Sequence, residues 1–454
     1  MNTDGPFDIP TQSSTSRGWV ALAFAAYLCG LFSGLVAALF RLALGRVDTL
    51  RGALVTWAQA FGLPGCLLMM ALVAVMAAMA AWLVQRFAPS ASGSGIPHVE
   101  AVVCGELPPA PFRLLPVKFL GGLLAIGSGL ALGREGPSVQ MGASVGGLLS
   151  RRFRFSDEQT RALLAAGAGA GLATAFNAPL AGAVFVLEEL VRRFDVRIAV
   201  AALSASAGAI FVARVFYGSA PDFAVPAIAF LPLGVGWIFF GLGLLAGVAG
   251  AAYTRAILMA LRFADRLRAR TPLVPAAIVG AAVGALAWWS PSWVGGGDPL
   301  TQAALSGEVV LALLPWVFFL RFFLGAACYA AGTPGGIFAP MLVLGAQLGL
   351  LFSMLLPGTI LSDSPAQAFA VVGMAAFFIA VVRSPLTGIV LVTELTGSFP
   401  LLLPMLAAGT AAMIVAPMLG AAPIYDALKE RTLASARRSD SSKPIVVGDI
   451  AQRK

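Results

Sequence analysis

Two stretches of the sequence resemble each other across about 200 positions, and this internal similarity decides the fold. Residues 133–146 read GREGPSVQMGASVG, and residues 336–349 read GIFAPMLVLGAQLG. Five small or cyclic residues coincide when the first stretch is shifted by 336 − 133 = 203 positions. A second pair, PLAGAVFVLE at 179–188 and PLTGIVLVTE at 385–394, matches with a shift of 385 − 179 = 206 positions. Because both pairs keep nearly the same register, the chain contains two related halves.

The composition excludes a soluble protein. The chain has 454 residues, of which 59% are hydrophobic and 11% are charged, whereas soluble domains carry about 25% charged residues. Continuous apolar runs such as 71–83 and 233–253 do not alternate as the strands of a membrane β-barrel do. At about 20 residues per membrane crossing, the length allows roughly 12 to 16 segments. We therefore predict an all-α integral membrane protein.

The repeat and the composition together suggest how the chain is divided. We predict an N-terminal arm at 1–18, a first transmembrane repeat at 19–217, a linker at 218–231, a second repeat at 232–419 and a cytoplasmic tail within 420–454. Transporters built from two related halves usually place them in opposite membrane orientations, with the substrate at the midplane where helices are broken. We therefore expect inverted repeats of broken, tilted helices.

The net charge of +9 resembles that of a polyanion-binding protein, but its distribution favours membrane orientation. Basic residues cluster on one set of loops and in the C-terminal tail, as the positive-inside rule predicts for the cytoplasmic side. The expected partners are therefore the lipid bilayer and transported ions, with no nucleic acid. The short polar arm lacks a cleavage pattern, which fits a multi-pass protein of a bacterial inner membrane. The clusters are Arg151, Arg152 and Arg154; Arg192, Arg193 and Arg197; and Arg262, Arg266, Arg268 and Arg270.

Three segments combine glycine with proline in a way that breaks one helix and begins another. Glycine permits unusual backbone angles, and proline suits the first helical turn, where its missing N–H costs nothing. Helix N-termini present free N–H groups and a partial positive charge, so several of them together bind an anion without a buried full cation. The segments are Gly93, Ser94, Gly95, Ile96 and Pro97; Gly133, Arg134, Glu135, Gly136 and Pro137; and Gly336, Ile337, Phe338, Ala339 and Pro340.

These three segments, in this order and spacing, resemble the selectivity motifs of the CLC family of chloride channels and chloride/proton antiporters. FNAPL at 176–180, the adjacent acids Glu188 and Glu189, and PIY at 423–425 follow in the expected places. The resemblance extends over nearly the whole chain. It implies a proton-coupled chloride transporter that forms a homodimer with one pathway in each subunit.

The resemblance also implies roles for individual residues. Ser94 and Tyr425 would offer hydroxyl groups to chloride, and Ile337 and Phe338 would offer backbone N–H groups. Glu135 would be the gate and the outer proton carrier, since a carboxylate at an anion site competes with chloride when ionised and can leave it when protonated. Glu189 would carry protons on the inner side. Only 454 − 425 = 29 residues follow Tyr425, so no nucleotide-sensing domain or other cofactor is expected.

Two alternative functions remain at this stage. The first is a passive chloride channel. The second is an intramembrane serine hydrolase, because GASVG at 142–146 fits the nucleophile pattern G-x-S-x-G, with Ser144 as nucleophile and His98 as base. The second half keeps both glycines but has Gln347 in place of the serine, which favours small-residue helix packing. The four cysteines lack CxxC spacing, so neither a disulfide nor a metal site is predicted.

Two further residues, Glu188 and Lys118, have ordinary structural interpretations. Glu188 has the counterpart Glu394 in the second repeat, whereas Leu395 stands opposite Glu189, so we interpret Glu188 as structural and Glu189 as specialised. Lys118 is expected to snorkel or to satisfy helix-end carbonyls rather than to bind an anion.

Overall fold

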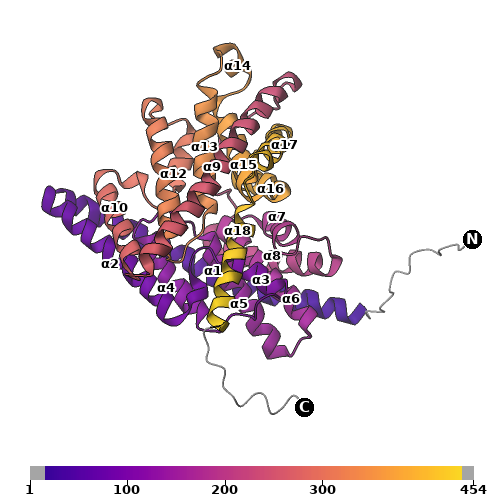
Figure 1. The fold of residues 1–454 in the computed structure, drawn as a ribbon. Helices are drawn as coiled ribbons and strands as arrows, with labels where there is room; N and C mark the ends of the chain where they lie inside the picture. The colour runs from indigo at the N-terminus through magenta and orange to yellow at the C-terminus, as the bar shows by residue number, and fades with distance from the viewer. Residues whose placement is uncertain (1–15, 442–454) are drawn as a thin grey trace, which may run out of the picture.

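The computed structural model describes residues 16–441 (Figure 1). Every regular secondary-structure element named within this range is a helix. The prediction of an all-α protein is therefore confirmed. The first half consists of α1 (Ser16–Gln59), α2 (Leu63–Phe87), α3 (Ile96–Val103), α4 (Leu114–Gly127), α5 (Glu135–Phe153), α6 (Asp157–Phe176), α7 (Pro179–Phe185) and α8 (Val196–Tyr217). The second half consists of α9 (Gly236–Arg268), α10 (Val274–Trp289), α11 (Asp298–Ser306), α12 (Leu314–Ala330), α13 (Phe338–Ser353), α14 (Gly358–Asp363), α15 (Ala366–Val382), α16 (Pro385–Thr396) and α17 (Leu402–Met418).

Helices continue into both the predicted N-terminal arm and the predicted C-terminal tail. Residues 1–15 and 442–454, which include most of the predicted arm and the end of the tail, lie outside the described residues. Helix α1 begins at Ser16, so the last three residues of the predicted arm belong to a helix. The described part of the tail is also helical, as α18 (Ile424–Ser441).

Six helical segments within residues 16–441 are long and apolar enough to cross a bilayer, by length and composition. They are Trp19–Gln59, Leu63–Phe87, Val196–Tyr217, Gly236–Arg268, Leu311–Ala330 and Phe399–Met418. Other apolar helices have only 10–17 residues, among them α4, α13 and α16, and a helix of 14 residues spans about 21 Å. Such helices cannot cross the roughly 30 Å hydrocarbon core. The protein is therefore a multi-pass membrane protein with many broken helices.

Glycines pack matching pairs of helices in the two halves. A Cβ atom on Gly142 of α5 would lie 2.1 Å from the carbonyl oxygen of Gly167 in α6. In the second half, a Cβ atom on Gly345 of α13 would lie 2.5 Å from the carbonyl oxygen of Gly373 in α15. Only glycine permits these approaches, so the glycines of the 142–146 motif serve helix packing.

The two halves have opposite orientations, and two carboxylates establish this directly. Glu188, just after α7, accepts hydrogen bonds from the backbone N–H groups of Leu386 at 3.0 Å and Thr387 at 2.6 Å, in the first turn of α16. Glu394, near the end of α16, accepts hydrogen bonds from Leu180 at 3.1 Å and Ala181 at 2.8 Å, in the first turn of α7. Because the end of each helix meets the start of its counterpart, the equivalent helices are antiparallel and the repeats are inverted.

Candidate functional site

The three broken segments predicted from the sequence meet through their backbones. Gly133 and Gly336 exchange two hydrogen bonds of 2.8 Å, N–H to carbonyl in both directions. Gly93 donates to the carbonyl of Thr333 at 3.0 Å and accepts from Gly335 at 3.0 Å. These short bridges join the residues just before α3, α5 and α13, so the N-termini of three helices are held close together.

Ser94 lies in the first of these segments and is fully buried. Its Oγ accepts a hydrogen bond from the backbone N–H of Ile96 at 3.3 Å, and its own backbone N–H donates to the hydroxyl of Tyr329 at 3.5 Å. Gly95, at the start of α3, has a φ of 82°, a left-handed conformation that favours glycine. The local turn therefore orients the Ser94 hydroxyl.

Lys118 of α4 fixes the same segment from behind. Its Nζ is completely buried and donates hydrogen bonds to the carbonyls of Ala91 at 2.9 Å and Gly93 at 2.7 Å. Of the two structural roles expected for Lys118, satisfying carbonyls is therefore correct and snorkelling is not. The ammonium is occupied by carbonyl oxygens on both sides of Ser92, so it supports the Ser94 segment.

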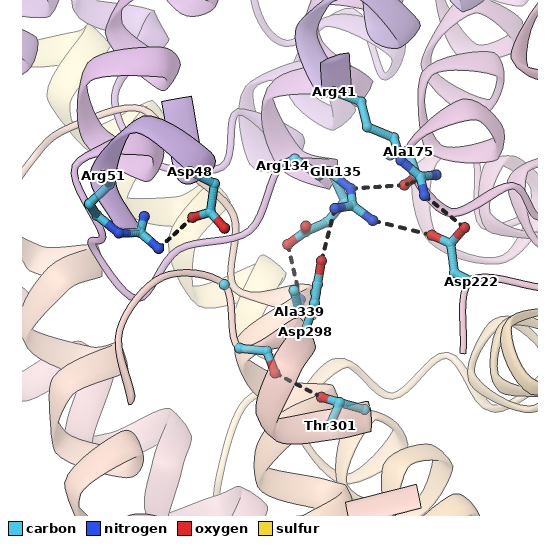
Figure 2. Close-up of polar contacts among 12 residues, drawn as sticks. Arg41, Asp48, Arg51, Arg134, Glu135, Ala175, Asp222, Asp298, Thr301 and Ala339 are labelled. Carbon is cyan, nitrogen blue, oxygen red and sulfur yellow. Dashed lines mark hydrogen bonds and ion pairs between the residues drawn. The ribbon is translucent and has the colours of Figure 1, made fainter. Parts of the chain in front are cut away.

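Glu135 is the first residue of α5, and its carboxylate points at the second repeat (Figure 2). The side chain is fully buried, and Oε1 accepts a hydrogen bond from the backbone N–H of Ala339 at 3.2 Å, in the first turn of α13. Oε2 has no hydrogen-bond partner among the described residues. Cβ atoms on Gly133 and Gly336 would lie 2.1 Å and 2.5 Å from the carboxylate oxygens. These two glycines therefore leave the space that the carboxylate fills.

An ion network holds the backbone next to Glu135 (Figure 2). Arg134 bridges Asp298 at 2.9 Å and Asp222 at 3.2 Å. Asp222, in the linker between the repeats, also pairs with Arg41 of α1 at 2.9 Å. Arg134 and Arg41 both donate to the carbonyl of Ala175. The network ties the first repeat, the linker and the second repeat together at the position of Glu135.

A cavity of about 730 Å³ opens beside this network, and Glu135 and Ala339 form part of its lining. We call it the Glu135 cavity. The lining also holds four arginines, Arg41, Arg46, Arg51 and Arg134, and the two acids Asp48 and Asp298. Basic residues therefore slightly outnumber acidic ones, including Glu135, which favours the approach of an anion.

Phe338 and Tyr425 form an aromatic contact at the N-terminus of α13. Both are fully buried, and their rings stack with centroids 5.9 Å apart. Phe338, the first residue of α13, also packs against Phe176, Phe185 and Phe378. The hydroxyl of Tyr425 is buried and has no partner among the described residues. Ile337 is fully buried as well.

Glu189 lies in a π-helical turn, Val186–Leu190, a rare conformation that is frequent at functional sites. Only 3% of the residue is exposed. One carboxylate oxygen accepts a hydrogen bond from the hydroxyl of Ser384, and the other lies 3.3 Å from Nη2 of Arg192. Glu189 lines a cavity of about 610 Å³ that also involves Arg192, Arg383 and Asp426. We call it the Glu189 cavity.

The two cavities lie at opposite ends of the protein. Leu22 of α1 lines a third cavity together with Arg193, and Arg193 also lines the Glu189 cavity. Arg41 of the same helix lines the Glu135 cavity. The 19 residues from Leu22 to Arg41 span about 28 Å of helix, close to the thickness of the hydrocarbon core.

Sequence reasoning missed one buried acid, Glu100 of α3. It is 1% exposed, and its Oε1 lies 3.3 Å from Nζ of Lys429 and 3.5 Å from Nη2 of Arg192. Its position three residues after Pro97, in the short helix that follows the first broken segment, is the signal that could have identified it, because charged residues within membrane segments are functional candidates.

The hydrolase interpretation fails on geometry. Ser144 and His98 line the same cavity, but its volume is only about 20 Å³. Ser144 lies in the middle of α5 and donates to the carbonyl of Gln140 at 2.9 Å, whereas a nucleophile elbow lies on a sharp strand-to-helix turn.

Residues 76–417 match the family model for the voltage gated chloride channel. An H(+)/Cl(-) exchange transporter, ClcA, from Vibrio cholerae serotype O1 is 39% identical over 449 residues, which are 97% of this chain and 96% of the relative. ClcA from Klebsiella pneumoniae is 37% identical over 436 residues, 93% of this chain and 91% of the relative. A solved structure of a slow cyanobacterial Cl-/H+ antiporter is 36% identical, with a TM-score of 0.88, and covers 91% of this chain and 98% of its own.

Proposed function

We propose that this chain, which belongs to the voltage gated chloride channel family, exchanges chloride for protons across the membrane, with the anion held at the meeting point of α3, α5 and α13. The similarity to H(+)/Cl(-) exchange transporters over almost the full length of both proteins supports exchange rather than passive conduction. As a transporter, the protein moves ions and leaves them chemically unchanged.

The proposed chloride site uses partial charges. The hydroxyl groups of Ser94 and Tyr425 and the backbone N–H groups of Ile337 and Phe338 would donate to the anion. The Tyr425 hydroxyl supports this assignment because it is buried without a partner among residues 16–441, and such a group costs free energy unless something binds it. Helix N-termini stabilise chloride without a buried full cation, whose charge would hold the ion too tightly for rapid passage.

The position of Glu135 is the observation that carries the proposal. Its carboxylate accepts the Ala339 N–H at the N-terminus of α13, the kind of group that would otherwise bind an anion. The ionised side chain thus stands in for a chloride ion. When a proton arrives from the Glu135 cavity, the side chain becomes neutral and its interaction with the N-terminus of α13 weakens. The side chain then leaves this position, and chloride can bind there.

Glu189 would exchange protons with the opposite side. It faces the Glu189 cavity, away from the Glu135 cavity, so protons and chloride share the route at Glu135 and take separate routes near Glu189. Basic residues around this cavity and on α18 support a cytoplasmic position for this end, in line with the positive-inside rule. We therefore place the C-terminus in the cytoplasm and the protein in a bacterial inner membrane.

We further propose a homodimer with a complete pathway in each subunit. Every residue of the proposed site belongs to one chain, so each subunit would transport by itself.

The test uses purified full-length protein in phospholipid vesicles. A chloride gradient imposed on vesicles without a pH gradient should drive protons uphill, measured with a pH electrode, while chloride movement is followed with a silver chloride electrode. Chloride flux without proton movement would leave only a passive channel, and the absence of both fluxes would contradict chloride transport.

A further inference from the structure

Arg192 lies between the proposed proton site and the helix that carries Tyr425. Its Nη2 atom is 3.3 Å from Oε1 of Glu189, 3.5 Å from Oε1 of Glu100, and hydrogen-bonded to Oδ1 of Asp426. Asp426 is the next residue after Tyr425, in the first turn of α18. One nitrogen atom therefore contacts carboxylates from the π-helical turn, α3 and α18.

The three carboxylates compete for this nitrogen. Nη2 of an arginine carries two hydrogens, and three acceptor oxygens lie within 3.5 Å of it. Two of the acids, Glu100 and Glu189, have side chains only 1% and 4% exposed, where charge interactions are less screened than at the surface. A change of charge on one acid must therefore redistribute the hydrogen bonds of the others.

The backbone at Arg192 supports a role for its side chain. Arg192 has a φ of 55° and lies two residues after the end of the π-helical turn. Glycine usually occupies such a left-handed position at the end of a helix because a Cβ atom is unfavourable there. An arginine at this point places its guanidinium where Glu189 and Asp426 can both reach it.

Other ion pairs attach α18 farther from Tyr425. Lys429 contacts Glu100 at 3.3 Å and Glu106 at 2.9 Å, and Arg431 contacts Asp265 of α9 at 2.6 Å. The Asp426–Arg192 pair is the attachment nearest to Tyr425, and of these it alone shares its partner with Glu189.

We propose that Arg192 is a positioning residue that links the protonation of Glu189 to the placement of Tyr425; this inference rests on the proposed exchange function. When Glu189 is ionised, it attracts the guanidinium of Arg192 and weakens the ion pair between Arg192 and Asp426. When Glu189 is protonated, the guanidinium pairs more fully with Asp426 and holds Tyr425 against Phe338. Proton arrival from the Glu189 cavity thus narrows the anion path, so the two ions do not pass this end together.

Several other charged groups surround this pair, and they set its local field. They come from the π-helical turn and the residues after it, from α3, from α18 and from the residue that follows α15. They are Glu188, Arg193, Glu100, Lys429 and Arg383.

The pair is suited to mutation because it is partly open to solvent. The Arg192 side chain is 42% exposed and the Asp426 side chain is 33% exposed, and such pairs contribute little to stability. Asp426→Asn should therefore fold, and it leaves Glu189, Glu100 and Arg192 in place.

The experiment measures chloride and proton flux for full-length protein in phosphatidylethanolamine–phosphatidylglycerol vesicles. We expect Asp426→Asn to raise chloride flux about two- to fivefold, the range that corresponds to an exposed ion pair, and to lower the number of protons moved per chloride. Lowering the pH on the Glu189 side should slow chloride flux in the unsubstituted protein and should no longer do so in Asp426→Asn. Arg192→Gln should act in the same way, whereas Asp426→Glu should restore coupling.

Arg431→Gln is the matched control, because it removes another ion pair of α18 without touching the partners of Glu189. Its coupling should equal that of the unsubstituted protein. Equal loss of coupling in Arg431→Gln and Asp426→Asn would reduce Arg192 to a general tether of α18 and overturn the inference. An unchanged ratio and pH profile in both Asp426→Asn and Arg192→Gln would also overturn it while leaving exchange intact, whereas an unsubstituted protein that moves no protons would refute the exchange function itself.

Discussion

The carboxylate of Glu135 in the first repeat accepts a hydrogen bond from the backbone N–H of Ala339 in the second, over a distance of 3.2 Å. The two residues are 204 positions apart in the sequence, and they meet because the preceding glycines, Gly133 and Gly336, pair across the inverted repeats. A helix N-terminus of one half is therefore filled by an acid from the other.

Replacement of Glu135 by glutamine should separate the two fluxes. The amide is neutral at every pH, so it neither carries a proton nor competes with chloride as a charged group. We expect proton movement to fall to the level of protein-free vesicles while chloride flux continues. A Glu135→Gln protein that still moves protons against their gradient would remove Glu135 from the proton route.

Glu189→Gln should also abolish proton movement while chloride still passes, because the proposed inner proton carrier is lost. The exposed acid Glu158, whose side chain is 71% exposed, supplies a control that changes the charge of the chain equally. Glu158→Gln should transport both ions normally in the same vesicle measurement. Normal proton flux in Glu189→Gln would assign the inner relay to another acid.

Glu188→Gln should affect stability rather than coupling. Glu188 accepts hydrogen bonds from two backbone N–H groups and from the hydroxyl of Thr387 at 2.7 Å, and hydrogen bonds to charged groups contribute about 1.5–3 kcal/mol each. We expect a loss of about 1–3 kcal/mol, seen as a lower unfolding temperature in detergent, with an unchanged ratio of chloride to protons. Glu394→Gln, its counterpart, changes a carboxylate that accepts the two backbone N–H groups of Leu180 and Ala181 and should give a smaller loss, because Glu188 also accepts the Thr387 hydroxyl. A larger loss in Glu394→Gln than in Glu188→Gln would contradict this account of the two contacts.

Gly336→Ala should displace the Glu135 carboxylate, because the added Cβ atom would lie 2.5 Å from Oε1. Overpacking of this kind costs about 1–3 kcal/mol. The displaced side chain should admit chloride without a proton, so we expect more chloride moved per proton in vesicles. Gly45→Ala is the control: Gly45 lines the same cavity but has open space around its Cβ position, and its coupling should not change.

Lys118→Met should weaken chloride binding through the Ser94 segment. The substitution removes two hydrogen bonds, so the carbonyl of Ala91 loses its ammonium donor while that of Gly93 keeps only the N–H of Gly335, at about 1–3 kcal/mol for a buried group left unsatisfied. Titration calorimetry with chloride should give a clearly weaker affinity than for the unsubstituted protein. Arg113→Met, which removes an exposed cation near the same helix, should bind chloride normally. Equal chloride affinities in the unsubstituted protein and both variants would show that Lys118 does not contribute to chloride binding.

Much of the fold could be predicted from the sequence because the repeat leaves matching glycines and prolines in both halves. The broken segments at 93–97, 133–137 and 336–340 were expected to form one site, and the backbone bridges between Gly93, Gly133 and the 333–336 segment confirm that they meet. The structural interpretation of Glu188 agrees with its hydrogen bonds to α16.

The ion pairs around the site could not be predicted. Arg134 meets Asp222 and Asp298 across 88 and 164 positions, and no local pattern signals a contact of that range. Lys429 and Glu100 are 329 positions apart, so the sequence gives no sign of their contact. The charge of the tail predicts only its side of the membrane, whereas the structure shows a helix that pairs with a buried acid. The positive-inside rule interprets basic residues only as signals of membrane orientation. It therefore gives no reason to expect Arg41 at the Glu135 cavity.

The reciprocal contacts of Glu188 and Glu394 have a consequence for biosynthesis. The N–H group of Leu386 that Glu188 binds is 198 residues later in the chain, which corresponds to roughly 10 to 40 s of translation at usual rates. During that interval Glu188 lacks its partners in α16, and the N–H groups in the first turn of α7 lack the carboxylate of Glu394. These reciprocal contacts therefore form only after α16 has been synthesised, so the first repeat is made before the groups that complete it.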